Sequence, residues 1–209
     1  MVITERLAQL RREMAGHGMD GYVVVTDDFH GSEYVGDFFK ARAYLSGFTG
    51  SAGTLVVLPE QAALWTDGRY FLQAAEQLTG STIDLMRMGQ PGVPTIGAFL
   101  AEHLPEGGVL GFDGRTISSS FAHTLETALA EKHIRFHGSE DLVDAVWPDR
   151  PALSDRPVWE LTGCGMSREE KLAKLREKMA AQNAAYLLLT SLTEIAWALN
   201  LRGGDVACT

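Results

Sequence analysis

The sequence predicts an α/β fold: a mixed central sheet flanked by helices, followed by an incomplete second copy of the same unit. Helical and strand patterns alternate from residue 4 to residue 137, which is typical of a sheet covered on both faces. A proline-rich stretch then breaks the pattern, and a helix similar to the first one follows it. These observations predict two units of unequal length.

An amphipathic helix opens the first unit. Residues 4–15 repeat apolar side chains at helical spacing, with Thr4 as the expected N-cap. Short apolar runs between turn residues predict strands at 22–26, 54–58, 62–66, 82–88, 109–112 and 133–137. Helices are expected between them at 68–78, 94–104 and 119–131. Asp67 is the expected cap of the helix at 68–78, which places Arg69 in its first turn.

The alternation stops between Gly138 and Gly165. Three of the seven prolines lie between residues 148 and 157, which predicts an extended connector. A new helix is expected from Ser167, with two glutamates in its first turn where carboxylates suit the helix dipole. The predicted domains are therefore residues 1–157, connector included, and residues 158–209.

The helix after the connector repeats the first one. Residues 5–15 and 170–180 are identical at seven of eleven positions. Each is followed by an apolar run that starts with Tyr and ends with Thr, at 22–26 and 186–190. Amphipathic helices share residue types by composition alone, but the matching apolar run favours a repeated supersecondary unit. The second copy is expected to be an incomplete one that leaves apolar surface uncovered.

Composition limits the classes of function. The 209 residues carry 27 acidic and 18 basic side chains, a net charge of −9. This balance argues against a general surface for nucleic acid or anionic membrane, because such binding depends on Lys and Arg. No secretory segment is visible, and no apolar run approaches the about 20 residues of a membrane helix. Cys164 and Cys208 are too few and too far apart for a disulfide framework or zinc site. The chain is expected to be cytoplasmic.

The glycines at residues 47–53 invite comparison with phosphate loops. Such loops precede a helix whose free amides hold the anion, whereas a strand is expected here and no Gly-Lys-Ser/Thr occurs. A tight turn between strands is therefore favoured. Ser51 does not fit a nucleophile elbow either, because Thr49 occupies the first glycine position of Gly-x-Ser-x-Gly.

No complete catalytic centre or metal site can be assembled from the remaining residues. His133 and His137 are four apart on an expected strand, without the glutamate of a His-Glu-x-x-His helix. Asp27, Asp28 and His30 form a polar cluster that a loop after a strand explains equally well.

Arg69 is the unusual residue. A cation in the first turn of a helix opposes the dipole, so Arg69 is expected to pair with an acid or a ligand. A local ion pair with Asp67 is the simpler alternative.

Three segments are similar to a known family. They are Ser32-Glu33-Tyr34, Arg-Ala-Tyr-Leu-Ser-Gly-Phe-Thr-Gly-Ser-Ala-Gly-Thr at 42–54, and Leu-Trp-Thr-Asp-Gly-Arg-Tyr-Phe-Leu-Gln-Ala at 64–74. Together they resemble the N-terminal region of the Xaa-Pro aminopeptidases, the aminopeptidase P enzymes of the creatinase or "pita-bread" group. Residues 194–205 resemble the middle domain of the long, three-domain cytosolic form. The resemblance spans essentially the whole chain.

The resemblance implies a creatinase-type, ribonuclease H-like first domain in a metal-dependent hydrolase. Such an enzyme removes the N-terminal residue from peptides with proline in second position, acts as a cytoplasmic homodimer, and holds two divalent cations, typically manganese, in a C-terminal catalytic domain. This chain is then expected to bind no cofactor or metal and to be inactive by itself, while it contributes substrate access and subunit contacts. Two alternatives stay open: a stand-alone binding or oligomerisation module, and the N-terminal part of a creatinase-like C–N hydrolase.

The resemblance also implies roles for single residues. Arg69 matches the arginine of a Trp-Thr-Asp-Gly-Arg-Tyr motif that binds peptide in related enzymes, and its five donors suit a carbonyl or carboxylate. His30 and Glu33 are candidates for an inter-domain or inter-subunit surface. Residues 200–203 are expected either to shape contacts of the middle domain or to form a structural loop.

Overall fold

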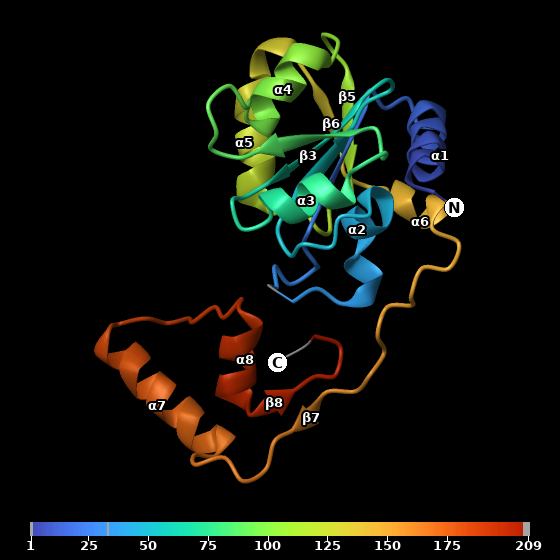
Figure 1. Ribbon diagram of the computed structural model, residues 1–209. Helices are drawn as coiled ribbons and strands as arrows, with labels where there is room; N and C mark the ends of the chain where they lie inside the picture. The colour runs from blue at the N-terminus through green and yellow to red at the C-terminus, as the bar shows by residue number, and fades with distance from the viewer. Residues whose placement is uncertain (1, 33, 207–209) are drawn as a thin grey trace.

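The computed structural model describes residues 2–32 and 34–206, so the candidate residues Glu33 and Cys208 lie outside the described part. A six-stranded sheet with helices on both faces forms the first unit, and two helices with a two-stranded sheet form the second (Figure 1). The elements in chain order are α1 (Ile3–Gly16), β1 (Gly21–Val25), η1 (Asp37–Phe39), α2 (Ala41–Ser46), β2 (Thr54–Val57), β3 (Ala62–Thr66), α3 (Phe71–Gln77), β4 (Ile83–Arg87), α4 (Ile96–His103), β5 (Val109–Phe112), α5 (Ser119–Leu129), η2 (Ala130–Lys132), β6 (Arg135–His137), α6 (Leu142–Val146), β7 (Trp159–Glu160), α7 (Arg168–Ala181), α8 (Leu192–Leu199) and β8 (Leu201–Arg202).

The large sheet is mixed, as predicted. Its strand order is β4-β3-β2-β1-β5-β6, and β2 runs antiparallel to both of its neighbours while every other neighbouring pair is parallel. Five strands therefore run in the same direction, so their carboxyl ends lie at one edge of the sheet. The loops that follow β1, β3 and β5 meet at this edge.

Alternate residues of each strand enter two separate cores. Tyr22 and Val24 of β1 pack on the face that α1 and α6 cover, whereas Val23 packs on the face under α4 and α5. Figure 1 shows these helix pairs on opposite sides of the sheet. Because β1 is covered on both faces, its sequence is a continuous apolar run.

The start of α1 differs from the prediction. Its N-cap is Val2 instead of Thr4, and the backbone N–H of Val2 donates to Glu5 Oε2 at 3.2 Å. The expected strand at 133–137 is also shorter, because His133 adopts a left-handed conformation (φ 51°) at the end of η2. His133 and His137 therefore do not share one strand.

The start of α3 moves as well. Residues 67–70 form a turn in which the backbone N–H of Tyr70 donates to the Asp67 carbonyl at 3.0 Å, and the helix begins only at Phe71. Inside this turn the Asp67 carboxylate accepts a hydrogen bond from the N–H of Arg69. Asp side chains often form such local turns, which compete with the start of a helix. Arg69 therefore lies before the helix and not in its first turn.

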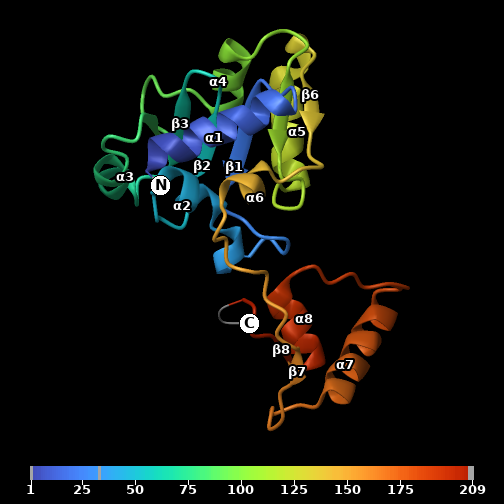
Figure 2. The same cartoon turned by 90° about the vertical axis from the view of Figure 1, so that its right-hand side faces the viewer.

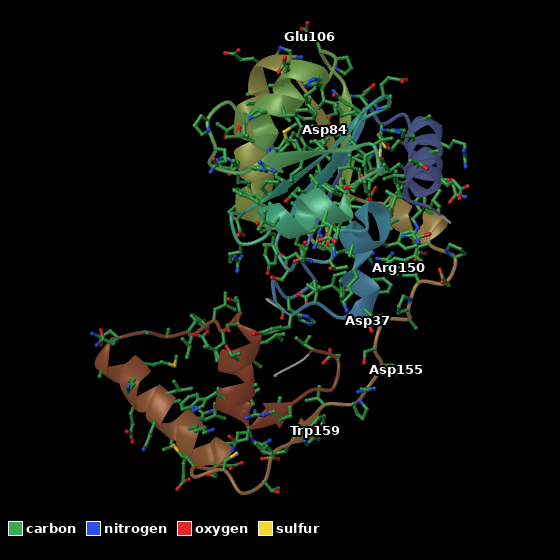
Figure 3. The ribbon with its side chains drawn as sticks, in the orientation of Figure 1. Asp37, Asp84, Glu106, Arg150, Asp155 and Trp159 are labelled. Atoms are coloured by element: carbon green, nitrogen blue, oxygen red, sulfur yellow. The ribbon has the colours of Figure 1, made fainter. Side chains whose placement is uncertain are left out.

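The predicted connector is partly folded. Within residues 138–165, the short helix α6 packs against α1 with three buried apolar side chains. Residues 151–158 are exposed and extended, so they are the part of the predicted connector that has no regular structure. Arg150 anchors the start of this segment, because it donates to Asp141 at 2.6 Å and to the Phe38 carbonyl at 2.9 Å. Figure 3 marks Arg150 at this exit point, with Trp159 farther along the chain.

The second unit contains the predicted helix but lacks the predicted strand. Ser167 caps α7 through the N–H of Glu170, so the helix begins at Arg168, one residue after the predicted start. Residues 186–190 form no strand, and Tyr186 and Leu188 are 93% and 84% exposed. A strand needs a neighbour for its backbone hydrogen bonds; β1 has β2 and β5, whereas no described strand pairs with residues 186–190. In Figure 2 the helices α7 and α8 lie apart from the large sheet, at the far end of the connector.

Candidate functional site

The glycine-rich loop, residues 47–53, joins α2 to β2 at the carboxyl edge of the sheet. It is therefore a helix-to-strand turn, not the predicted turn between strands. Arg42 holds it from inside: Nε donates to Thr26 Oγ1 at 2.7 Å, Nη1 to the Phe48 carbonyl at 2.6 Å, and Nη2 to the Gly50 carbonyl. Only 3% of Arg42 is exposed, and this burial lowers its pKa to about 10.

Packing and backbone conformation explain two of the loop glycines. A Cβ at Gly50 would lie 2.3 Å from the Phe48 ring and 2.8 Å from the Tyr70 ring. Gly47 ends α2 with φ 73°, a left-handed conformation that suits glycine. Gly50 is therefore required by close packing and Gly47 by its backbone conformation, in agreement with the preference for a turn over a phosphate loop.

Arg69 and Asp67 form a bidentate ion pair beside this loop. Arg69 Nε lies 2.9 Å from Asp67 Oδ1, and Nη2 lies 2.8 Å from Oδ2. Hydrogen bonding to Arg69 lowers the pKa of the Asp67 carboxyl. The local pair offered as the alternative is thus present, yet 66% of the Arg69 side chain is exposed. The carboxylate fixes the direction of the guanidinium and leaves it accessible to solvent.

A second Asp-Gly-Arg turn follows β5. Arg115 contacts Asp113 through its backbone N–H, Nε and Nη2 at 3.0, 2.9 and 2.9 Å, the same three contacts that Arg69 makes. Arg115 also lies 3.4 Å from Asp141 and over the Phe29 ring. Arg115 was not among the predicted site residues, although the repeated Asp-Gly-Arg triplet is a signal for it in the sequence.

A hydrogen bond connects the Arg69 turn to the glycine-rich loop. The Ser51 hydroxyl lies 2.7 Å from the Tyr70 hydroxyl, and this contact lowers the pKa of Tyr70. Next to Ser51 opens a cavity of about 380 Å³, the loop cavity. Its lining residues are Thr26, Tyr34, Val35, Phe39, Lys40, Arg42, Ala43, Thr49, Gly50 and Ser51. Tyr34, the glycine-rich loop and the Arg69 turn belong to the three segments that carry the family resemblance, so these segments meet here.

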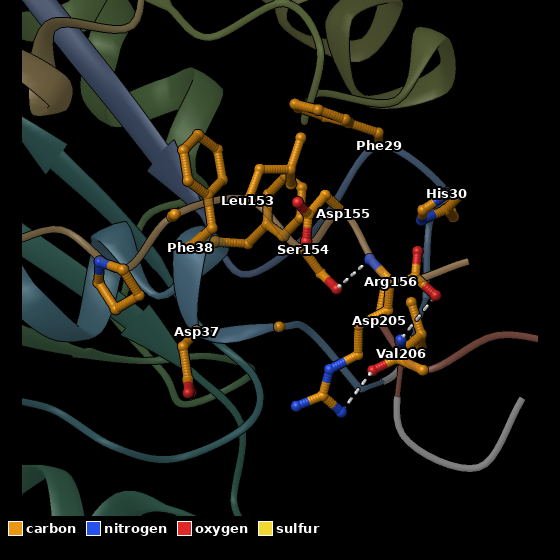
Figure 4. Close-up of a pocket in the computed structure, with 15 residues that line it drawn as sticks. Phe29, His30, Asp37, Phe38, Leu153, Ser154, Asp155, Arg156, Asp205 and Val206 are labelled. Atoms are coloured by element: carbon orange, nitrogen blue, oxygen red, sulfur yellow. Dashed lines mark hydrogen bonds between the residues drawn. The ribbon is translucent and has the colours of Figure 1, made fainter. Parts of the chain in front are cut away.

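His30 lies at a second cavity, of about 550 Å³, where the first unit meets the connector and the end of the second unit (Figure 4). Its Nδ1 is 3.5 Å from Oδ2 of the buried Asp28. In the same cavity Arg156 donates to the Gly204 carbonyl at 3.3 Å. The position of His30 between the units is compatible with an inter-domain role, which stays a prediction.

Asn200 makes the contacts of a structural residue. It ends α8 in a left-handed conformation (φ 53°), accepts from Lys171 Nζ, and donates to the Met166 carbonyl at 3.1 Å. These bonds tie the end of α8 to the start of α7, which favours the structural alternative for residues 200–203.

Two negative findings concern the described residues. Among residues 2–32 and 34–206, no three His, Cys, Asp or Glu side chains gather in a way that could hold a metal ion. In the same part of the chain, no helix combines the length and the apolar character that crossing a membrane requires.

Comparison with known proteins identifies the family. Residues 6–146 match the creatinase/prolidase N-terminal domain family, and residues 149–209 match a second family of the same description. The chain belongs to the creatinase/prolidase N-terminal domain family. The predicted boundary between residues 157 and 158 stays a prediction.

Relatives of this creatinase/prolidase chain include peptidases that are about three times as long. The chain is 42% identical over 213 residues to aminopeptidase P2 of Arabidopsis thaliana, covering 99% of the chain and 30% of that relative. It is 40% identical over 193 residues to the Xaa-Pro aminopeptidase ApepP of Drosophila melanogaster, covering 90% and 31%. The crystal structure of X-prolyl aminopeptidase from Caenorhabditis elegans, described as a cytosolic enzyme with a di-nuclear active site, superposes with a TM-score of 0.84 at 35% identity, covering 99% and 35%. The chain thus spans about a third of the length of these relatives.

Proposed function

We propose that this chain is the N-terminal, non-catalytic part of a metal-dependent Xaa-Pro aminopeptidase, a hydrolase that removes the N-terminal residue from peptides with proline in second position. One observation carries the proposal: 99% of the chain superposes on the Caenorhabditis elegans X-prolyl aminopeptidase with a TM-score of 0.84. We further propose that the full-length enzyme is a cytoplasmic homodimer and that it binds two divalent cations, typically manganese.

The chain's own residues do not fit a dinuclear metal centre, because no suitable group of three ligands occurs among residues 2–32 and 34–206. The proposal therefore assigns bond cleavage to the part of the relatives that this chain does not cover. The role left for this chain is to bind and orient the peptide and to make domain contacts.

Arg69 is the proposed substrate-binding residue. Its guanidinium is exposed, and the bidentate contact with Asp67 fixes it in one direction. A donor that is already oriented loses less conformational entropy when it binds a peptide carbonyl or carboxylate. His30, at the second cavity, is proposed to make contacts between domains or subunits.

The test uses the full-length protein that carries this chain. Arg69→Met is expected to lower kcat/KM for an Xaa-Pro-Pro peptide by about tenfold or more, the effect of losing about 1.4 kcal/mol of binding. Arg115→Met is the matched control, because Arg115 has the same contacts with its own aspartate. An unchanged kcat/KM in the Arg69 variant would show that Arg69 does not bind the substrate and has a structural role only.

The chain alone provides a second test. With Mn²⁺ and the same peptide, residues 1–209 are expected to release no free amino acid. Metal-dependent release would contradict the assignment of cleavage to another part of the protein.

A further inference from the structure

We propose that the loop cavity is a specificity pocket for an apolar side chain of the bound peptide. This inference rests on the proposed function. It adds that the enzyme prefers substrates with an apolar side chain at a peptide position other than the one that Arg69 contacts. The cavity measures about 380 Å³, within the range of about 300–1,000 Å³ typical of ligand pockets.

Five polar side chains of the cavity already have hydrogen-bond or ion-pair partners, which favours an apolar occupant; they are Thr26, Lys40, Arg42, Thr49 and Ser51. All the bonds of Arg42 go to Thr26 and to loop carbonyls. Lys40 pairs with Asp37, and Thr49 accepts from the amide groups of two glutamines. A charged ligand would have to break these pairs. An apolar side chain would instead contact Val35, Phe39 and Ala43 and leave the pairs intact.

The cavity also has fixed walls. Arg42 holds the glycine-rich loop, and Phe39, another lining residue, is buried with 8% exposure. Tyr34, which also lines the cavity, is 53% exposed. A pocket that exists before the ligand arrives loses little conformational entropy on binding.

A single tyrosine separates the cavity from Arg69. The Arg69 Cζ lies 5.2 Å from the Tyr70 ring centre, and the Tyr70 hydroxyl lies 2.7 Å from Ser51, which lines the cavity. An extended peptide advances about 3.3–3.6 Å per residue, so a few residues are enough to pass one tyrosine side chain. The pocket therefore receives a side chain of the same peptide that Arg69 holds.

The test measures hydrolysis by the full-length protein. The substrates are Ala-Pro-Gly-Gly-Gly amide and the three peptides in which one leucine replaces a glycine. Wild type is expected to prefer leucine over glycine at least fivefold in kcat/KM at one position. Ala43→Phe, which places a larger side chain in the cavity, is expected to reduce the leucine-to-glycine ratio of kcat/KM to about one. Ala130→Phe, at an exposed position on η2, is the control.

The outcomes separate the two proposals. A leucine preference that persists in Ala43→Phe overturns the pocket, as does the absence of any preference in wild type. If Ala43→Phe does not fold, Val35→Ser supplies the same comparison with a polar wall. Arg69→Met is expected to lower kcat/KM for all four peptides equally. Absence of Xaa-Pro hydrolysis by the full-length protein overturns the proposed function, and the pocket with it.

Discussion

The hydroxyl of Ser51 and the phenolic hydroxyl of Tyr70 lie 2.7 Å apart, and this one hydrogen bond joins the glycine-rich loop to the turn that carries Arg69. The two residues come from different segments, one before β2 and one after β3. The bond therefore couples the loop cavity to the proposed peptide-binding arginine.

Removing this bond is expected to change the titration of Tyr70. In the folded chain the Ser51 hydroxyl lowers the Tyr70 pKa, because it stabilises the phenolate. Ser51→Ala is therefore expected to raise the Tyr70 pKa toward its ordinary value, as measured by NMR of ring-labelled tyrosine. Tyr70→Phe assigns the signal. An unchanged Tyr70 titration in Ser51→Ala would show that the contact does not persist in solution.

Arg42 is expected to be essential for the stability of the first unit. Arg42→Met leaves the Phe48 and Gly50 carbonyls without their buried donor, so the free energy of unfolding should fall by about 2–4 kcal/mol. Arg12→Met, at an exposed position of α1, should change it by less than about 0.5 kcal/mol. Urea unfolding measures both. Similar losses in the two variants would contradict the supporting role of Arg42.

Asp27 is expected to cost stability at neutral pH. Burial raises its pKa above the ordinary value of 3.8, so the folded chain binds this proton more tightly than the unfolded chain. Stability from this group is therefore lost as the pH rises through the raised pKa. Asp27→Asn keeps the acceptor for the Asp28 N–H and removes the charge. The variant should be more stable than wild type at about pH 7, with a gap that closes toward pH 4. A constant gap in urea unfolding across this range would exclude the linkage.

Asn200 is expected to stabilise the second unit alone. Asn200→Ala removes one of the two acceptors of the buried Lys171 ammonium, leaving the Trp197 carbonyl, and places alanine at a positive φ, so a loss of about 2 kcal/mol is expected. Asn200→Gly tolerates the backbone conformation and isolates the side-chain contribution. Hydrogen exchange should quicken in α7 and α8 and stay unchanged in β1–β5. Faster exchange throughout the sheet would mean that the two units unfold together.

Local pattern was sufficient for most of the large sheet, because its strands are short apolar runs between turn residues. The same pattern at residues 186–190 was misleading, since a strand also needs a neighbour that the run itself does not encode. Arg69 could be singled out from sequence, but the turn closed by its bond to Asp67 shifts the helix start by three residues, from the predicted Gly68 to Phe71. The loop cavity was not predictable, because it depends on tertiary contacts that bring Tyr34 beside Ser51.

The strand order has a consequence for the order of folding. The lining residues of the loop cavity all lie between residues 26 and 51, and β2 pairs with β3 through a short local turn. β1, in contrast, obtains its other neighbour from β5, near the far end of the first unit. Closing so long a loop is entropically costly, so contacts between distant segments form late. A chain emerging from the ribosome therefore has the residues for its cavity before it has the strands that complete its sheet.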